Sequence, residues 1–366
     1  MAEPFKNLIS PAAVRAAAQQ LAAVWPGFDA AQFAQRACRG LEALELKARA
    51  LHVCAALERS LPADFEQAAA GLRAAMQGEH GLKGWILWPV GEYIARHGQA
   101  QPVLALDLLR TLTPRFTAEW AIRPFIEQHP TLSFETLARW VDDPDEHVRR
   151  LVSEGSRPRL PWGLQLKGLI ADPTPTLALL ERLQDDPSEY VRRSVANHLN
   201  DIAKDHPALV AAWVETHLPN APPERQKLLR HACRTLIKAG DARVLKAFGL
   251  GQALKGTVAL HVSPPRIRLG EAVELQVVLQ SNVRRPQALL IDYAVHHVKA
   301  AGHRTAKVFK GWRVELAPGE TRTLVKRHAV KPITTRVYHA GPHAVDLRVN
   351  GRVVAEAGFE LDLPKA

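Results

Sequence analysis

The sequence contains few cysteines and no long apolar run. Cys38, Cys54 and Cys233 are its three cysteines in 366 residues, and they form no CxxC motif and no even set. This spacing excludes a disulfide framework and a cysteine-based metal site, so we expect reduced core residues in a cytoplasmic protein. No stretch approaches the ~18 apolar residues that a membrane span requires. The N-terminus lacks a basic start followed by an apolar stretch, which predicts no signal peptide and no membrane partner.

The common motifs of nucleotide, protease and hydrolase sites are also missing. There is no GxGxxG, P-loop, HExxH or GxSxG motif,. The sixteen histidines show no metal-ligand spacing, and the adjacent His296 and His297 would point to opposite faces of a strand,. We therefore expect neither a metal nor a cofactor.

Acidic residues are fewer than basic ones, and most of the excess of basic residues lies near the C-terminus. The formal net charge is +11, and residues 255–366 carry 18 lysines and arginines against 9 acidic residues. Such a balance favours a polyanionic partner without establishing one.

Residues 1–252 are predicted to form a helical domain. Alanine and leucine are dense, apolar residues recur every three or four positions, and proline or glycine interrupts the pattern at helix-turn-helix intervals,. Residues 141–150 (VDDPDEHVRR) and 184–193 (QDDPSEYVRR) repeat at an offset of 43 residues. That period is typical of HEAT-like repeats, which stack into an α-solenoid. In each copy, Asp-Pro is expected to stop one helix and cap the next, and the following valine is expected to face the core.

Residues 256–366 are predicted to form a smaller all-β domain. Seven or so short, β-branched and often alternating segments are separated by SPP, PGE, AGP and NG turns,. This pattern favours an immunoglobulin-like sandwich without an internal disulfide.

An arginine pair follows each copy of the repeated motif. A solvated helix face with Glu–Arg ion pairs, such as Glu146 with Arg150 and Glu189 with Arg193, is the ordinary interpretation,. Two pairs in register, followed by more basic and amide side chains, instead favour a track for DNA phosphates, because a planar guanidinium donates two hydrogen bonds at once. The predicted DNA-binding residues are Arg149, Arg150, Arg157, Arg159, Lys167, Arg192, Arg193, Asn197, Asn200 and Lys204.

Three other residues are candidates for the chemistry. Glu154 stands in the basic stretch LVSEGSRPRLPWG, where an acid is expected to be repelled by nearby phosphates unless it stabilises a cation. Glu119 lies 35 residues earlier, and stacked helices could bring the two carboxylates together,. Trp162 in LPWG could form an aromatic wall against a sugar or base. The alternatives are two surface glutamates at helix positions and a loop tryptophan folded onto the core.

Several long motifs resemble a known family. GLEALELKARALHV, WILWPVGEYIARHG, EWAIRPFI, HVRRLVSEGSRPRLPWG and DDPSEYVRRSVANHLNDIAKDHP are similar to the AlkC branch of the HEAT-repeat DNA glycosylases, over residues 1–250 nearly end to end. The C-terminal segment resembles the Ig-like domain that a subset of this branch carries. The resemblance implies an enzyme that removes 3-methyladenine and 3-methylcytosine from double-stranded DNA without flipping the base. By motif position it implies catalytic roles for Glu154, Glu119 and Trp162, and a role for Arg150 in holding the DNA backbone.

Two other interpretations stay open. One is a non-catalytic HEAT scaffold that binds nucleic acid, in which Glu119 and Glu154 are dispensable while the arginine pairs matter. The other is an adaptor whose concave face binds an acidic protein partner. For the enzyme we expect a monomer that acts in the cytoplasm, associated with the nucleoid.

Overall fold

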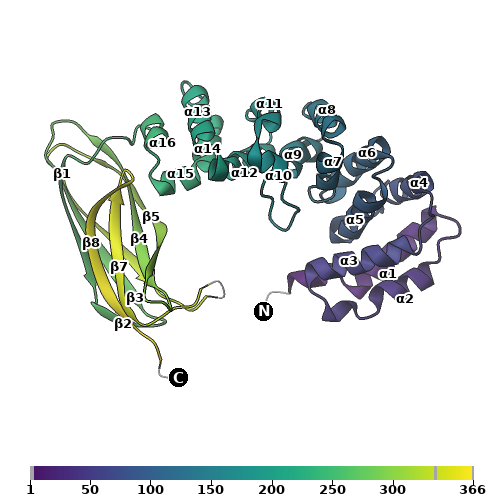
Figure 1. Ribbon diagram of the computed structural model, residues 1–366, viewed down its shortest axis with the longest axis horizontal. Coiled ribbons are helices and arrows are strands. Elements are labelled where there is room, and N and C mark those ends of the chain that lie inside the picture. The colour runs from purple at the N-terminus through teal and green to yellow at the C-terminus, as the bar shows by residue number, and fades with distance from the viewer. Residues whose placement is uncertain (1–3, 334–335, 365–366) are drawn as a thin grey trace. The chain divides into compact units, whose positions relative to one another are not determined.

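Figure 1 shows a computed structural model of the chain, which describes residues 4–333 and 336–364. The chain forms two compact units. The first comprises Met1–Asp205 with Pro222–Ala232, and the second comprises His206–Ala221 with Cys233–Ala366. The last described helix ends at Ala247 and the first strand begins at Gly256.

The first unit is helical, and its helices stack in chain order as neighbouring pairs (Figure 1). Its α-helices are α1 (Pro11–Val24), α2 (Ala30–Cys38), α3 (Leu46–Glu58), α4 (Phe65–Ala75), α5 (Leu87–His97), α6 (Pro102–Leu112), α7 (Arg123–Gln128), α8 (Pro130–Trp140), α9 (Glu146–Gly155), α10 (Lys167–Ala171), α11 (Thr174–Leu183), α12 (Glu189–Asp205) and α14 (Pro223–Ala232). Short 3-10 helices are η1 (Phe5–Leu8), η2 (Leu41–Ala43), η3 (Gly84–Ile86) and η4 (Thr113–Arg115). No helix among the described residues is long and apolar enough to cross a membrane.

The local sequence explains why these helices begin and which face they bury. At α1, Ser10 Oγ accepts from Ala13 N at 3.3 Å, and Pro11 occupies the first helical position,. Val14 and Leu21 of the same helix are buried at helical spacing,. Burial of such aliphatic side chains stabilises the unit by about 1.5–3 kcal/mol each.

The repeated Asp-Asp-Pro turn caps its helix differently from the sequence prediction. The N-cap of α9 is Asp145, whose Oδ1 accepts from His147 N at 2.7 Å. The prediction that Asp-Pro caps and opens the helix is therefore wrong at this turn. Asp143 Oδ1 instead accepts from Asp145 N at 3.0 Å and closes the turn that precedes the helix,. Asp143 also accepts from Arg110 of the previous repeat.

A ladder of arginine–aspartate bonds joins successive repeats. Arg110 Nε donates to Asp143 Oδ2 at 2.6 Å, and Arg149 Nε donates to Asp186 Oδ2 at 2.7 Å. The valine of each repeat, such as Val148, is buried as predicted. The repeat therefore encodes a stacking contact as well as a helix start.

The second unit combines the helices α13 (Pro207–His217), α15 (Arg234–Ala239) and α16 (Ala242–Ala247) with a β-sandwich. Its described strands are β1 (Gly256–Ser263), β2 (Arg266–Arg268), β3 (Ala272–Ser281), β4 (Gln287–Val298), β5 (Arg304–Leu316), β6 (Thr321–Ala329), β7 (Gly341–Val349) and β8 (Arg352–Asp362). One sheet has the order β1-β3-β6 and the other β2-β8-β7-β4-β5, with antiparallel pairing except between β2 and β8.

The sandwich core follows the alternation in the strands. In β3, Val273, Leu275, Val277 and Leu279 are all buried, while the residues between them are more exposed. The core contains apolar residues of both sheets,. The predicted mainly helical domain followed by a smaller β-sandwich is confirmed.

Candidate active site

Glu154 lies in the last turn of α9 and is 6% exposed. The helix places it there because Val148 and Leu151 of the same helix are buried in the unit. Glu154 Oε1 accepts from Arg157 Nη1 at 2.6 Å, and Oε2 accepts from Ser194 Oγ at 2.6 Å. A buried carboxylate is costly without such partners, and here they fix its orientation.

Glu119 lies just before α7 and reaches the same place. It is 8% exposed, and its Oε2 accepts from Thr117 Oγ1 at 2.9 Å. Arg150 Nη1 lies 2.6 Å from Glu119 Oε2, and Arg150 Nη2 lies 3.6 Å from Glu154 Oε1. The structure thus places the two candidate carboxylates in one site, beside a shared guanidinium. Neither carboxylate is the surface residue of the alternative interpretation.

The aromatic ring of Tyr190 flanks that guanidinium. Arg150 Cζ lies 5.1 Å from the centroid of the Tyr190 ring, within the range of a cation–π contact,. Burial opposes the charge of Arg150, but the carboxylates of Glu119 and Glu154 raise its pKa above the usual value,. Sequence reasoning missed Tyr190. The signal was its position in the repeat, where it is equivalent to His147.

Arg157 continues the site, because it belongs to a row of side chains whose charges alternate in sign. Its guanidinium is 2.8 Å from Asp201 Oδ2 as well as 2.6 Å from Glu154 Oε1, and Lys204 Nζ donates to Asp201 Oδ1 at 2.8 Å. Burial lowers the pKa of Arg157, but Glu154 and Asp201 outweigh it and raise the pKa overall. Arg157 is only 7% exposed, so in this arrangement it orients Glu154. Sequence reasoning did not identify Asp201.

Trp162 is exposed on a strained loop. Its side chain is 61% exposed, and its backbone has a φ of +63°, which L residues other than glycine rarely adopt,. Lys47 Nζ donates to Trp162 O at 3.2 Å, and Trp120 Nε1 donates to Pro161 O at 3.2 Å. Each interpretation of Trp162 describes part of this arrangement, because its ring is exposed to a partner and also packs against the buried Trp88.

The ring of Trp162 is attached to a cluster of aromatic side chains. Trp88 and Trp120 stack with centroids 4.4 Å apart, and the Trp162 centroid lies 6.4 Å from Trp88 and 6.5 Å from Trp120. Trp85 and Phe116 continue the cluster. Because Trp120 follows Glu119 directly, the cluster connects Trp162 to the carboxylate pair.

The predicted DNA-binding arginines have different surroundings. Arg149 bonds to Asp186 and to Asp143 O, and Arg192 Nη1 donates to Asp186 O and Pro187 O, so both hold the repeated turns. Arg193 is 67% exposed and lies 3.1 Å from Glu189. The ion pair between Arg193 and Glu189 was expected in the ordinary interpretation. The expected pair of Arg150 with Glu146 does not form, because Arg150 lies beside Glu119 and Glu154.

The remaining predicted DNA-binding residues vary in exposure. Lys167 is exposed at the start of α10, and Arg159 is held by Asp205 through two hydrogen bonds of 2.7 Å. Asn200 is 3% exposed, and His231 Nε2 lies 3.1 Å from Asn197 Oδ1. Exposed cations such as Lys167 are the better placed to meet phosphates.

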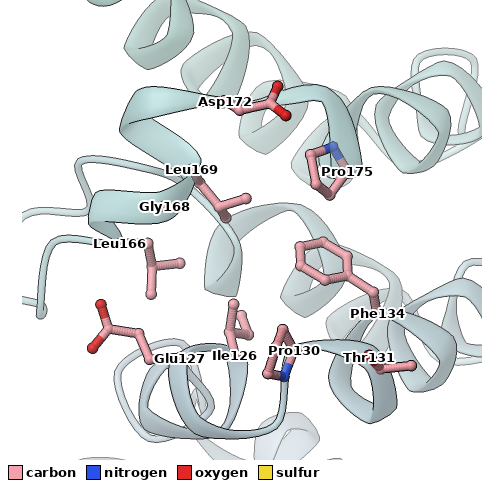
Figure 2. A pocket seen from close by; sticks show the side chains of 10 residues that line it. All are labelled: Ile126, Glu127, Pro130, Thr131, Phe134, Leu166, Gly168, Leu169, Asp172 and Pro175. Atoms are coloured by element: carbon pink, nitrogen blue, oxygen red, sulfur yellow. The ribbon is translucent and has the colours of Figure 1, made fainter.

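A cavity of about 810 Å³ lies elsewhere in the first unit, between the ends of α7, α8, α10 and α11. Figure 2 shows Ile126, Phe134 and Leu166 along it, with the carboxylates of Glu127 and Asp172 at its edges. Its lining residues differ from the candidate catalytic and DNA-binding residues. At the candidate site Glu119, Glu154 and Arg157 are each less than 10% exposed, and Trp162 is the exposed side chain beside them.

Comparisons with known proteins cover the part of the chain that contains the candidate site. A family model described as "DNA alkylation repair enzyme" matches residues 103–236, which contain all the candidate residues. The model "Uncharacterised protein YhaZ, C-terminal Ig-like domain" matches residues 257–363. "Uncharacterized protein YhaZ" of Bacillus subtilis (strain 168) is 38% identical over 325 residues, covering 87% of this chain and 88% of that protein.

A solved structure matches over the whole length. The structure of Pseudomonas fluorescens alkylpurine DNA glycosylase AlkC, bound to DNA containing an abasic site analog, superposes with a TM-score of 0.92 at 36% identity. The match covers 98% of this chain and 100% of that chain. The chain belongs to the AlkC-type DNA alkylation repair family. The resemblance inferred from the sequence motifs is confirmed, and so is the Ig-like character of the C-terminal domain.

Proposed function

We propose that this chain is a DNA glycosylase that excises cationic N-alkylated bases, 3-methyladenine and 3-methylcytosine, from double-stranded DNA without base flipping. The observation that carries the proposal is the convergence of Glu119 and Glu154 on Arg150, beside an exposed tryptophan. The matching AlkC structure, which holds DNA with an abasic site analog, supports DNA as the partner. The exposed ring of Trp162, which a sugar can contact from outside the protein, supports attack from the backbone side.

The chemistry of the lesion suits two carboxylates. Alkylation at N3 gives the base a positive charge, so the base leaves without a general acid. Cleavage of the N-glycosidic bond develops oxocarbenium character on the deoxyribose, and the fixed carboxylate of Glu154 stabilises it. Glu119 orients or deprotonates the attacking water. Arg150 compensates the two negative charges and holds the DNA backbone.

Trp162 adds an aromatic surface against the sugar. Its ring face attracts the developing cation by roughly 0.5–2 kcal/mol. A glycosylase that flips its base must unstack it at a cost of a few kcal/mol. An enzyme that works from the backbone side avoids this cost and relies on the charge of the lesion for selectivity. Neutral hypoxanthine is therefore expected to be a poor substrate.

The test is single-turnover release of 3-methyladenine or 3-methylcytosine from a damaged duplex by the wild type and by Glu154→Gln. We expect release by the wild type and a loss of about 10²-fold or more in Glu154→Gln, with DNA binding retained. Glu146→Gln is the matched control, since Glu146 is exposed on the same helix. Its rate should equal that of the wild type.

Each alternative has its own outcome in this assay. DNA binding without release by the wild type would support the non-catalytic scaffold. Weak, sequence-indifferent DNA binding and no release would support the adaptor for an acidic protein partner. Rapid hypoxanthine release would contradict selectivity by lesion charge. We further propose a monomer that acts in the cytoplasm, and sedimentation with and without a short duplex tests the monomeric state.

A further inference from the structure

Arg123 is a fully buried arginine at the start of α7, four residues after Glu119. Its recorded hydrogen bonds all go to carbonyl oxygens of one segment, residues 155–164. Nε donates to Leu164 O at 2.6 Å, Nη1 donates to Gly155 O and Arg157 O at 2.8 Å, and Nη2 approaches Pro158 O at 3.4 Å. One side chain thus holds both ends of the segment that carries Trp162.

This arrangement is unfavourable for Arg123 as a charged group. Burial, together with the nearby charge of Arg157, lowers its pKa to about 10. Arg123 forms no ion pair with the other described residues, so the carbonyl dipoles that it contacts stabilise its charge, together with the more distant carboxylates of Glu127, Asp201 and Glu119. A buried cation is expensive to retain, and an apolar side chain of similar size would pack at lower cost. The reason for the arginine lies in the segment that it holds.

That segment needs an external support. Trp162 has a left-handed backbone, and such strain persists only where the surroundings impose it,. Arg123 bonds to the carbonyls on both sides of this residue, at Pro158 and Leu164. Gly163 allows the close approach, because a Cβ there would lie 3.3 Å from Arg123 Cδ and Nε and 3.2 Å from Trp120 Cδ1. Gly155 similarly allows α9 to approach Ile122, since a Cβ would lie 2.6 Å from Ile122 Cγ2.

We infer that Arg123 is a positioning residue, which fixes the loop of Trp162 and the backbone of Arg157 relative to the Glu119–Glu154 pair. It acts through Trp162 and Arg157 and does not touch DNA, because its side chain is fully buried. Its effect on catalysis rests on the proposed function. Its effect on the loop does not, so the two are tested by different measurements.

The loop is tested by ¹⁹F NMR of protein labelled with 5-fluorotryptophan. The chain has eight tryptophans, and the resonance that disappears in Trp162→Phe reports on that ring. In Arg123→Gln we expect this resonance to shift or broaden, while that of Trp213 in the second unit stays in place. An unchanged Trp162 resonance in Arg123→Gln would overturn the inference, whatever the activity.

Catalysis is tested by single-turnover release from an alkylated duplex at saturating enzyme. Arg123→Gln should lower the rate constant at least about tenfold, because small displacements of a positioned group have large effects, while DNA affinity changes little. In a Trp162→Ala background the same change should have a much smaller effect, since both variants act on one element. Effects that multiply in the double variant would contradict action through the loop.

Two further variants separate positioning from loss of folding. Leu72→Ala creates a cavity in α4, lowers the melting temperature, and should leave the rate per folded molecule unchanged,. If Arg123→Gln does not fold, Gly163→Ala tests the same contact without removing the buried charge, and it should shift the Trp162 resonance and lower the rate. A normal resonance and rate in Gly163→Ala would then overturn the inference. A shifted Trp162 resonance in a protein whose wild type releases no base would leave the positioning role standing and remove the proposed function.

Discussion

Glu119 and Glu154 are 35 residues apart in the sequence, yet both carboxylates lie beside one guanidinium. Arg150 is 2.6 Å from Glu119 and 3.6 Å from Glu154, and both acids are at least nine-tenths buried. The cation between them offsets the repulsion that two buried negative charges would otherwise have. A pair held in this way is suited to divide two tasks at one sugar, stabilisation of the cation and orientation of water.

The two carboxylates are expected to be coupled. Glu119→Gln should lower single-turnover release by about tenfold or more, because the amide orients water but does not deprotonate it. When it is combined with Glu154→Gln, the loss should be smaller than the product of the two single losses. Single-turnover rates of the four proteins give this coupling. Glu127→Gln, an exposed residue of α7, serves as the control. Fully multiplicative losses would show that the two residues act at separate sites.

Arg149 and Arg193 should behave differently although they occupy similar positions in the repeats. Arg149→Ala leaves Asp186 buried without its partner, so the free energy of unfolding should fall by about 3 kcal/mol,. Arg193→Ala removes an exposed ion pair and should change stability by less than about 0.5 kcal/mol,. The Arg193→Ala substitution should instead weaken DNA binding. The fall of log K with the logarithm of the salt concentration should become less steep by about 0.9. Urea unfolding and anisotropy titrations measure the two effects, and the reverse pattern would exclude Arg193 as a phosphate contact.

The Ig-like domain is expected to add phosphate contacts. Arg284 and Arg285 are exposed between β3 and β4. Their joint replacement by alanine should weaken DNA binding. The fall of log K with the logarithm of the salt concentration should become less steep by up to about 1.8, since each phosphate contact releases about one counterion. Glu271→Gln alters an exposed acid of the same domain and should not reduce the slope. Four other basic residues of the domain, Lys307, Lys310, Lys326 and Arg327, lie within β5 and β6. An unchanged slope in the Arg284/Arg285 variant would remove this loop from the DNA contact.

Buried histidines make the stability of the second unit sensitive to acid. Burial, together with the charge of Arg336, lowers the pKa of His297 to about 3 and that of His328 to about 4. The unfolded chain takes up these protons near pH 6.5, and the folded chain takes them up only at lower pH. Their contribution is therefore complete above about pH 6.5 and decreases as the pH falls. From pH 7 to pH 5 the expected loss is roughly 2 kcal/mol for each histidine.

Hydrogen exchange of peptides from β4 and β6 measures this loss at pH 7 and pH 5. His328→Phe should make the pH dependence of opening shallower, whereas His303→Gln changes an exposed residue and should leave it as in the wild type. An equal pH dependence in the wild type and His328→Phe would show that His328 does not contribute to acid sensitivity.

The sequence predicted the elements well because their signals are local. Helical spacing with caps in the first unit and alternation in strands such as β3 indicated both fold classes. The repeat of 43 residues predicted stacked helices, and the motifs around Glu154 and Trp162 indicated the family. The N-cap at Asp145 was missed although an aspartate directly before a helix is a local signal, whereas the bond between Arg110 and Asp143 joins two repeats. No local pattern contains that contact.

By itself, the sequence determined the periodicity, the apolar residues that face the core, and the chemical types in the candidate site. Only the tertiary structure decided which charges meet. It assigned Arg150 to Glu119 and Glu154, Arg157 to Asp201, Arg149 to Asp186, and the buried Arg123 to the loop of Trp162. The physical reason is that electrostatic and hydrogen-bond partners depend on distance in space and on burial. Apart from Arg150 and Glu154, which share one helix, these partners are 31 to 44 positions apart and become neighbours only when the repeats stack,.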